Sequence, residues 1–296
     1  MQLTARAEDA GARLDAFLAG PLGSRARAQR LIEDGAVRVD GAVVPKRHRV
    51  SAGETVTVEE PPEPPPAAAV APAEFAVPYQ DEHLLVVDKP AGVVVHPARG
   101  HASGTLAQAL AGVAGGGDPG RAGIVHRLDR DTSGLLVVAR TAEAHRRLKA
   151  ALQAREVTRE YLALVEGRPP ARRGTIDAPL GRDRRVRTRM STDTDDPREA
   201  LTHFEIERAL VATTLLRVRL ETGRTHQIRA HLLAIGHPVA GDPEYGASGL
   251  LGLERQFLHA ARLAFAHPFT GEAVEVKSPL PEDLRAALER AAGSAS

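Results

Sequence analysis

The 296-residue chain contains no cysteine and no tryptophan, and aromatic residues make up only 3% of it. The absence of cysteine excludes disulfides, thiolate zinc sites and cysteine nucleophiles, and it fits a reducing compartment such as the cytoplasm. Because aromatics are so scarce, the core must be packed mainly by leucine, valine, isoleucine and alanine. The hydrophobic fraction of 43% and the charged fraction of 26% are ordinary for a soluble globular protein.

Targeting and membrane segments are also missing from the sequence. No apolar run approaches the length that spans a membrane. The first nine residues carry acidic side chains and lack an apolar core, so they resemble neither a secretory signal nor a transit peptide. We therefore expect a cytoplasmic protein without membrane contact, and we expect it to be a monomer.

Lysine is rare, since only 4 of the 39 basic residues are lysine and 35 are arginine. An arginine- and alanine-rich codon bias accounts for part of this excess, but arginine also grips phosphate bidentately and stacks on bases. The basic residues gather in two stretches. Residues 25–49 hold seven basic and three acidic side chains, and residues 172–189 hold seven arginines and two acids. Such patches on a chain of net charge +1 indicate an anionic partner at defined places.

The most informative stretch is residues 123–139, in which two apolar runs flank a polar turn. Residues 124–125 predict a first short strand and residues 134–139 a second. Turn chemistry explains residues 131–134, because short polar side chains bond the local backbone and glycine adopts a positive φ. It does not explain why three titratable or charged side chains crowd the same turn at the edge of a core, which makes them functional candidates. These three are His126, Arg127 and Asp129.

The pattern His-Arg-Leu-Asp-x-x-Thr-Ser-Gly at residues 126–134 resembles the signature of the RluA-type RNA pseudouridine synthases. Three further blocks resemble the same family in the same order, at residues 88–97, 159–163 and 222–231. Their patterns are Asp-Lys-Pro-Ala-Gly followed by Val-His-Pro, Arg-Glu-Tyr-x-Ala, and Thr-Gly-Arg-Thr-His-Gln-Ile-Arg-x-His. The resemblance implies an α+β fold with a mixed, mainly antiparallel sheet flanked by helices.

That resemblance implies an enzyme that isomerises uridine in RNA to pseudouridine without a cofactor. The uracil must leave C1′, rotate while held and rejoin through C5, so the nucleotide must first be flipped out of any helix. Asp129 is implied as the catalytic carboxylate, which either attacks covalently or takes a proton from the sugar. Arg229 is implied as its partner, because an adjacent cation favours the ionised carboxylate. Tyr161 would stack on the base and relay a proton.

Three substrate-binding residues are expected around this carboxylate. Arg127 is placed to enter the space that the base vacates or to hold phosphate, and His126 precedes it on the same turn. Leu258 matches a leucine that packs in the family's pocket. We predict a helix capped by Thr225, in which Arg229 lies beside the apolar stripe, so its guanidinium needs a buried partner.

A metal site is not expected. His226 and His231 are five residues apart and would point to different helix faces, and the chain has no His-Glu-x-x-His pattern.

The first 59 residues predict a small α/β module. Leu14, Phe17 and Leu18 favour a short helix, and Ser24 can cap a second helix that ends at Gly35. Residues 37–39 alternate as a strand, and Asp40-Gly41 indicates a tight hairpin that returns through residues 43–44. Residues 54–58 alternate as a further strand.

This module resembles the S4 RNA-binding domain. The matching residues are Arg13-Leu14-Asp15, Ser24-Arg25, Leu31-Ile32, Gly35-x-Val37-x-Val39 and Gly41. The clustered charge indicates that the second helix contacts RNA through Arg25, Arg27 and Arg30. The alternative is that these side chains only solvate an exposed helix face. Residues 60–73, rich in proline and alanine, are expected to be an extended linker between the module (residues 1–59) and a catalytic domain (residues 74–296).

Two other functions remain open at this point. The chain would be an RNA-binding protein without catalysis if Asp129 were only structural, and a hydrolase would need a second carboxylate that we do not find paired with it. Among synthases, the S4-like module favours a large-subunit (23S) rRNA substrate, and transfer RNA is the alternative.

Overall fold

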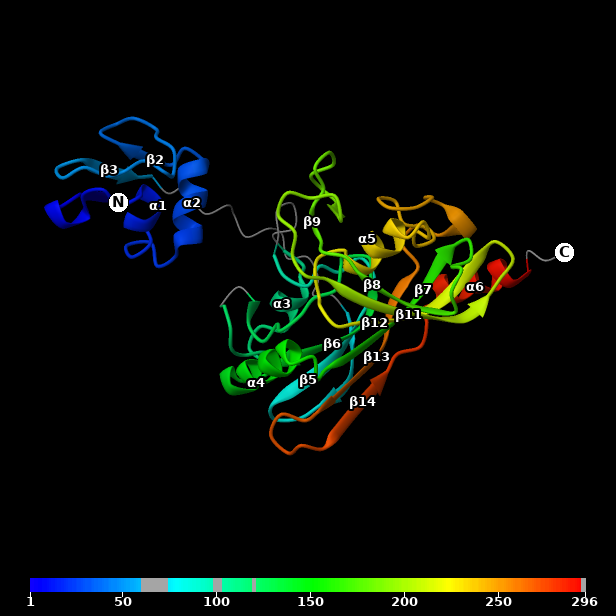
Figure 1. The fold of residues 1–296 in the computed structure, drawn as a ribbon. Helices are drawn as coiled ribbons and strands as arrows, with labels where there is room; N and C mark the ends of the chain where they lie inside the picture. The colour runs from blue at the N-terminus through cyan, green and yellow to red at the C-terminus, as the bar shows by residue number, and fades with distance from the viewer. Residues whose placement is uncertain (60–73, 98–102, 119–120, 294–296) are drawn as a thin grey trace. The chain divides into compact units, whose positions relative to one another are not determined.

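The computed structural model describes residues 1–59, 74–97, 103–118 and 121–293, and the predicted linker lies outside these ranges. The chain divides into two compact units, Met1–Ala68 and Ala69–Ser296. Within the described ranges, no helix is both long and apolar enough to cross a membrane. Figure 1 shows the elements of both units.

The N-terminal unit packs two helices on a three-stranded antiparallel sheet of order β1-β3-β2. Its core is aliphatic, as the shortage of aromatics requires, and includes Leu14, Leu18, Ile32 and Val56. The bounds are β1 Gln2–Thr4, the 3₁₀ turn Ala7–Asp9, α1 Leu14–Phe17, α2 Arg25–Glu33, β2 Val37–Val39 and β3 Thr55–Val58.

The capping serine and the terminal glycine predict α2 correctly, whereas the predicted hairpin partner of residues 37–39 is wrong. The Ser24 hydroxyl accepts the backbone N–H of Arg27 at 3.5 Å, and Gly35 follows the helix with φ +74°. Asp40 and Gly41 form the expected tight turn with positive φ, but pairing stops after one bridge. Residues 43–44 leave the sheet, and β2 pairs with β3 instead. The turn residues indicate where the chain reverses, but packing with distant segments decides which strand pairs with β2.

The second unit is built on a nine-stranded mixed sheet of order β4-β5-β6-β13-β7-β12-β11-β8, with β14 paired to β13. Only β6 and β13 run parallel, so the expectation of a mixed, mainly antiparallel sheet is confirmed. The strands are β4 Ala76–Gln80, β5 Leu84–Lys89, β6 Ser133–Ala139, β7 Thr158–Glu166, β8 Arg173–Asp177, β11 Leu201–Ala209, β12 Thr213–Leu220, β13 Leu258–Ala266 and β14 Ala273–Lys277. A separate two-stranded hairpin consists of β9 Gly181–Arg182 and β10 Met190–Ser191.

Helices cover both faces of the sheet, which explains why residues 84–87 of β5 and 134–139 of β6 are apolar without interruption. Alternate side chains of β5 and β6 pack on α4 on one face, and the others join the larger core on the opposite face. The helices are α3 Leu106–Ala109, α4 Ala142–Gln153, α5 Gln227–Ala234 and α6 Glu282–Gly293, with a 3₁₀ turn at Leu250–Gly252. Thr141 caps α4, and its hydroxyl accepts the N–H of Ala144 at 3.1 Å.

Three local predictions in this unit are wrong. The sequence Gly104-Thr105-Leu106 favours a helix that runs to about residue 113, but α3 ends at Ala109, and the chain turns through Gly112 at φ +83°. The strand expected at residues 124–125 is reduced to one bridge between Ile124 and Val138. Thr225 does not cap α5, because the N-cap is His226 in the left-handed region at φ 52°.

Candidate active site

The turn that carries Asp129 is held by three side chains from distant parts of the chain. Arg255 Nη1 donates to the carbonyl of Asp131 at 2.9 Å, and Gln256 Nε2 donates to Thr132 Oγ1 at 3.2 Å. The buried Lys89 Nζ donates to the carbonyl of Arg130 at 2.9 Å. Local turn chemistry therefore shapes the loop, while tertiary contacts position it.

The buried side chain of Lys89 also binds the turn that directly follows it in the chain. Its Nζ donates to the carbonyls of Pro90 and Val93 at 2.8 and 2.9 Å. Burial lowers the pKa of Lys89 to about 7. Three carbonyl acceptors use all three N–H groups of an ammonium ion, so the hydrogen bonds oppose that shift and favour the charged form. The turn after β5 and the turn before β6 are thereby tied together.

The main chain after Asp129 passes very close to its neighbouring strand. Gly134 pairs with Ala260 at the single parallel junction of the sheet and has φ +111°. A Cβ placed on Gly134 would lie 2.3 Å from the carbonyl oxygen of Ala260. Only glycine fits this position, both for the backbone conformation and for the contact.

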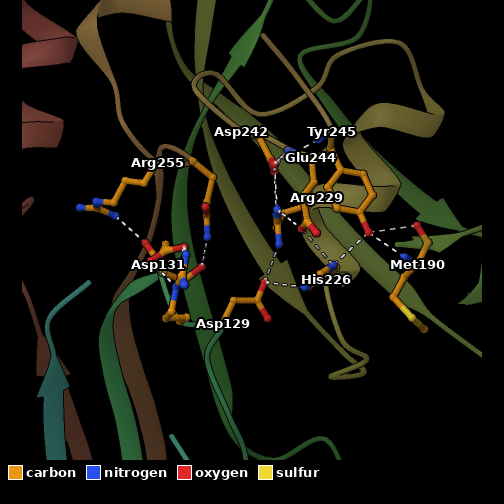
Figure 2. A network of polar contacts seen from close by, with 12 residues as sticks. Asp129, Asp131, Met190, His226, Arg229, Asp242, Glu244, Tyr245 and Arg255 are labelled. Carbon is orange, nitrogen blue, oxygen red and sulfur yellow. Dashed lines mark hydrogen bonds and ion pairs between the residues drawn. The ribbon is translucent and has the colours of Figure 1, made fainter. Parts of the chain in front are cut away.

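The carboxylate of Asp129 faces the guanidinium of Arg229 on α5 (Figure 2). Arg229 Nη1 lies 3.3 Å from Asp129 Oδ2. The same guanidinium donates through Nε and Nη2 to the fully buried Asp242 at 2.6 and 2.8 Å, and through Nη2 to Glu244 at 2.7 Å. One buried arginine is therefore held by a short bidentate pair and presents a single longer contact to Asp129.

A histidine and a tyrosine complete this network. The ring nitrogen Nδ1 of His226 lies 3.0 Å from the hydroxyl of Tyr245, and Nε2 lies 4.0 Å from Asp129 Oδ2. Burial lowers the pKa of His226, which favours the uncharged ring. The Tyr245 ring packs against the Arg229 guanidinium, 4.8 Å from its centroid, and its hydroxyl accepts the N–H of Met190 at 2.7 Å.

A cavity of about 570 Å³ opens beside this network and brings together six residues that the sequence singled out. Tyr161 is buried at 5% exposure on β7, and burial raises the pKa of its phenol, so the hydroxyl stays protonated at neutral pH. Asp129 keeps about a sixth of its side chain exposed. The six are His126, Arg127, Asp129, Tyr161, Arg229 and Leu258.

The other predicted contacts lie in the N-terminal unit, on α2. Arg27 and Arg30 are exposed there, whereas Arg25 is tied to the buried Asp15, with Nη2 to Oδ2 at 3.1 Å. Gln29 Nε2 donates to the same carboxylate oxygen at 2.7 Å. Arg25 thus has a structural partner and still exposes 54% of its side chain.

The basic stretch at residues 172–189 is less charged than its sequence indicates. Arg184 pairs with Asp193 at 3.1 Å and with Asp195 at 2.9 Å, and both acids lie just beyond the stretch. The hairpin between β9 and β10 brings these residues together, so the local excess of arginine is partly neutralised.

Three site residues were missed by sequence reasoning, although one signal pointed to them. The expectation that Arg229 needs a buried partner is correct, but the partner was sought only in Asp129. Asp242, Glu244 and Tyr245 lie on the loop after α5 and match no pattern that we had used. A search for acidic residues in the loop that follows the helix of Arg229 would have found Asp242.

Comparison with known proteins identifies the families to which the two units are similar. Residues 83–234 match the RNA pseudouridylate synthase family, and residues 12–56 match the S4 domain. An uncharacterised RNA pseudouridine synthase of Bacillus subtilis, YlyB, is 44% identical over 98% of this chain and 97% of its own length. Ribosomal large subunit pseudouridine synthase D of Nitrosomonas europaea is 45% identical over 98% of this chain and 87% of its own length.

A solved structure supports the same assignment. Human RNA pseudouridylate synthase domain containing 1 has 31% identity and a TM-score of 0.56, covering 71% of this chain and 84% of its own. The chain therefore belongs to the RNA pseudouridine synthase family. It is an isomerase of RNA uridines that carries an S4 domain at its N-terminal end.

Proposed function

We propose that this enzyme converts uridine to pseudouridine in large-subunit rRNA, with Asp129 as the catalytic carboxylate and no cofactor. The observation that carries the proposal is the arrangement of Asp129 itself. Its Oδ2 meets Arg229, whereas no hydrogen bond of the described residues engages its Oδ1, and the side chain lines the cavity. The Oδ1 atom is thus left to contact the sugar or base of the substrate.

The reaction conserves atoms, so the site needs positioning and proton transfer rather than an added reagent. The bond from N1 to C1′ breaks, the uracil rotates, a bond from C5 to C1′ forms, and the proton on C5 is exchanged for one on N1. Asp129 either attacks the nucleoside covalently or removes a proton from the sugar, and both routes place its carboxylate beside the ribose. Arg229 orients the carboxylate through its hydrogen bond to Oδ2.

Tyr161 and Leu258 would hold the base during its rotation. Both are buried and line the cavity beside Asp129, which suits stacking and apolar contact with a flipped uracil. Arg127 is exposed on the same turn and would occupy the space left in the RNA or hold a phosphate. His126 accepts the N–H of Val137 through Nε2 at 3.0 Å, so it positions the loop as well as lining the cavity.

The choice of rRNA rests on two comparisons. Relatives of about 45% identity over most of the chain are named ribosomal large subunit pseudouridine synthase D, and the N-terminal unit is an S4 domain. We infer that Arg25, Arg27 and Arg30 on α2 contact the RNA outside the catalytic cavity.

The substrate is tested by incubating the full-length enzyme with 23S rRNA and with tRNA transcripts, followed by pseudouridine mapping at nucleotide resolution. We expect new pseudouridines at defined positions of the 23S transcript and none in tRNA. Product only in tRNA would overturn the rRNA assignment, and tight RNA binding without product in either would favour the RNA-binding alternative.

A further inference from the structure

The cavity extends well past the catalytic group, and its far end is basic. That end is lined from one side by α4 and the residues after it, and from the other by the loop between β12 and α5. We call its three cationic side chains, Lys149, Arg155 and Arg224, the basic end. None of these residues had a role in the reaction described above.

Charge in the cavity is strongly one-sided. Apart from Asp129 and Arg229, the described lining has six cationic side chains and two carboxylates, Glu199 and Glu221. Both carboxylates already have partners: Glu199 pairs with Arg155, and Glu221 lies 3.3 Å from His203 and 3.5 Å from Arg219. Glu199 therefore neutralises Arg155, and the other five cations pair with neither acid. The six are Arg121, Arg127, Lys149, Arg155, Arg159 and Arg224.

Two members of the basic end have donors to spare. Lys149 is exposed, and no described residue pairs with its ammonium. Arg224 uses Nε to donate to the carbonyl of Glu199 at 3.0 Å, so its orientation is set while both terminal nitrogens stay free of described partners. An oriented guanidinium and a free ammonium that line the same cavity suit an oxyanion.

Lys149 differs from the other two basic residues considered on α4, Arg146 and Arg147. Arg146 and Arg147 both pair with Glu143, and neither lines the cavity. Arg147 also donates to the carbonyl of Pro268 at 2.8 Å. Of the three, only Lys149 presents an uncompensated charge to the cavity.

We propose that the basic end binds a backbone phosphate of a nucleotide next to the target uridine, with Lys149 and Arg224 as the contacting residues. This inference rests on the proposed function, because it assumes that uracil and ribose occupy the end near Asp129. The only full charges on an RNA strand are its phosphates, so a second, cationic end of the same cavity matches the strand that continues from the flipped nucleotide. The contact would position the strand and would not read its sequence.

Binding to the Asp129→Asn protein, which we expect to form no product, tests this without depending on turnover. Affinity for a fluorescent large-subunit rRNA fragment is measured between about 50 and 200 mM salt. The variants, made in the Asp129→Asn background, are Lys149→Gln, Lys149→Gln with Arg224→Gln, and Arg146→Gln as the matched control on the same helix.

We expect the slope of log affinity against log salt to become shallower by about 0.7–0.9 for each lost phosphate contact. Affinity at fixed salt should fall roughly three- to fivefold for Lys149→Gln, and further for the double variant. Arg146→Gln should change neither quantity. Slopes and affinities equal to those of the Arg146→Gln control, in both Lys149 variants, would overturn the proposal.

Failure of the proposed function gives a different result. If the wild type forms no pseudouridine while the salt slopes change as expected, the basic end binds RNA and the assignment of the reaction or its substrate is wrong. The single Lys149→Gln variant removes one exposed side chain from a helix surface, so it keeps the test valid if loss of the Arg224 contact to Glu199 disturbs the loop.

Discussion

At the scale of single residues, the site depends on how one guanidinium is shared among three carboxylates. Arg229 is 4% exposed and Asp242 is fully buried, so each needs the other to remain charged inside the protein. Glu244 is about a third exposed and can be solvated without its partner. The contact to Asp129 is the longest of the three. Asp242 therefore anchors the arginine, and Asp129 is left available for chemistry.

Replacing Asp242 with asparagine is expected to impair catalysis although Asp242 does not line the cavity. The amide nitrogen would face the guanidinium, and Arg229 would turn away from Asp129. We expect kcat to fall by about 100-fold or more, since misplaced charge near the reacting group costs several kcal/mol. The free energy of unfolding should fall by about 3 kcal/mol. Both are measured on the purified full chain.

Glu244→Gln is the matched control, because Glu244 contacts the same Nη2 from a more exposed position. It should lower kcat much less and leave the melting temperature nearly unchanged. Equal losses from the two substitutions would show that Asp242 does not anchor Arg229.

At the scale of elements, the junction of β6 and β13 holds the turn that carries Asp129. The turn ends where Gly134 meets Ala260, and two residues just before β13, Arg255 and Gln256, bind the turn itself. The position of Asp129 is thus set by the sheet.

Gly134→Ala is expected to destabilise the second unit strongly. The new methyl group would overlap the Ala260 carbonyl, and alanine would be strained at φ +111°. We expect a loss of at least about 2 kcal/mol in unfolding free energy, measured by urea denaturation. Gly293→Ala at the end of α6, where a Cβ has open space, should change it by less than about 1 kcal/mol. A Gly134→Ala protein as stable as this control would contradict the account of the junction.

Elements with strong local signals could be predicted from the sequence. Thr141 before an apolar helical spacing in the sequence indicates α4, and uninterrupted aliphatic runs at residues 84–87 and 134–139 indicate β5 and β6. Residues 43–44 and 124–125 read as strands by composition, but whether they pair depends on the distant segments beside them. The start of α5 was missed because Gln227 Oε1 accepts the N–H of Arg224, which replaces a threonine cap.

The residues of the candidate site could be predicted where they lie in a sequence motif, and not elsewhere. Asp129, Tyr161 and Arg229 lie in three separate motifs, and the sheet brings them to one cavity. Asp242 and Tyr245 follow α5 in a loop whose role depends on the geometry of Arg229, and no local pattern shows that geometry. The sequence could not predict a joint role for Lys149 and Arg224 either, because only the fold shows that both line the same cavity.

At the scale of the whole molecule, the chain consists of two units that each have a hydrophobic core of their own. The N-terminal unit also buries one carboxylate, Asp15, at 0% exposure. The hydrogen bond from Arg13, together with those from Gln29 and Arg25, lowers the pKa of Asp15 far below its usual range. Each unit should therefore respond separately to a substitution in its own core.

Asp15→Asn is expected to destabilise the N-terminal unit by about 2 kcal/mol, because the buried side chain loses charge-assisted hydrogen bonds from Arg13 and Arg25. Hydrogen exchange should accelerate in residues 14–58 and stay unchanged in residues 84–292. Because the folded pKa is depressed, the stability contributed by Asp15 is complete above its unfolded pKa of about 3.9 and is lost as the pH falls below that value. The difference between wild type and variant should therefore shrink below about pH 4, and a difference that is independent of pH would contradict this role.

The most direct test of the central claim is pseudouridine mapping of large-subunit rRNA incubated with wild-type enzyme and with Asp129→Asn. The variant keeps the size of the side chain and one acceptor oxygen, and it removes the charge and basicity. We predict site-specific pseudouridine from the wild type, and none from the variant, which should still bind the RNA. Equal product from both proteins would contradict the assignment of Asp129 as the catalytic residue.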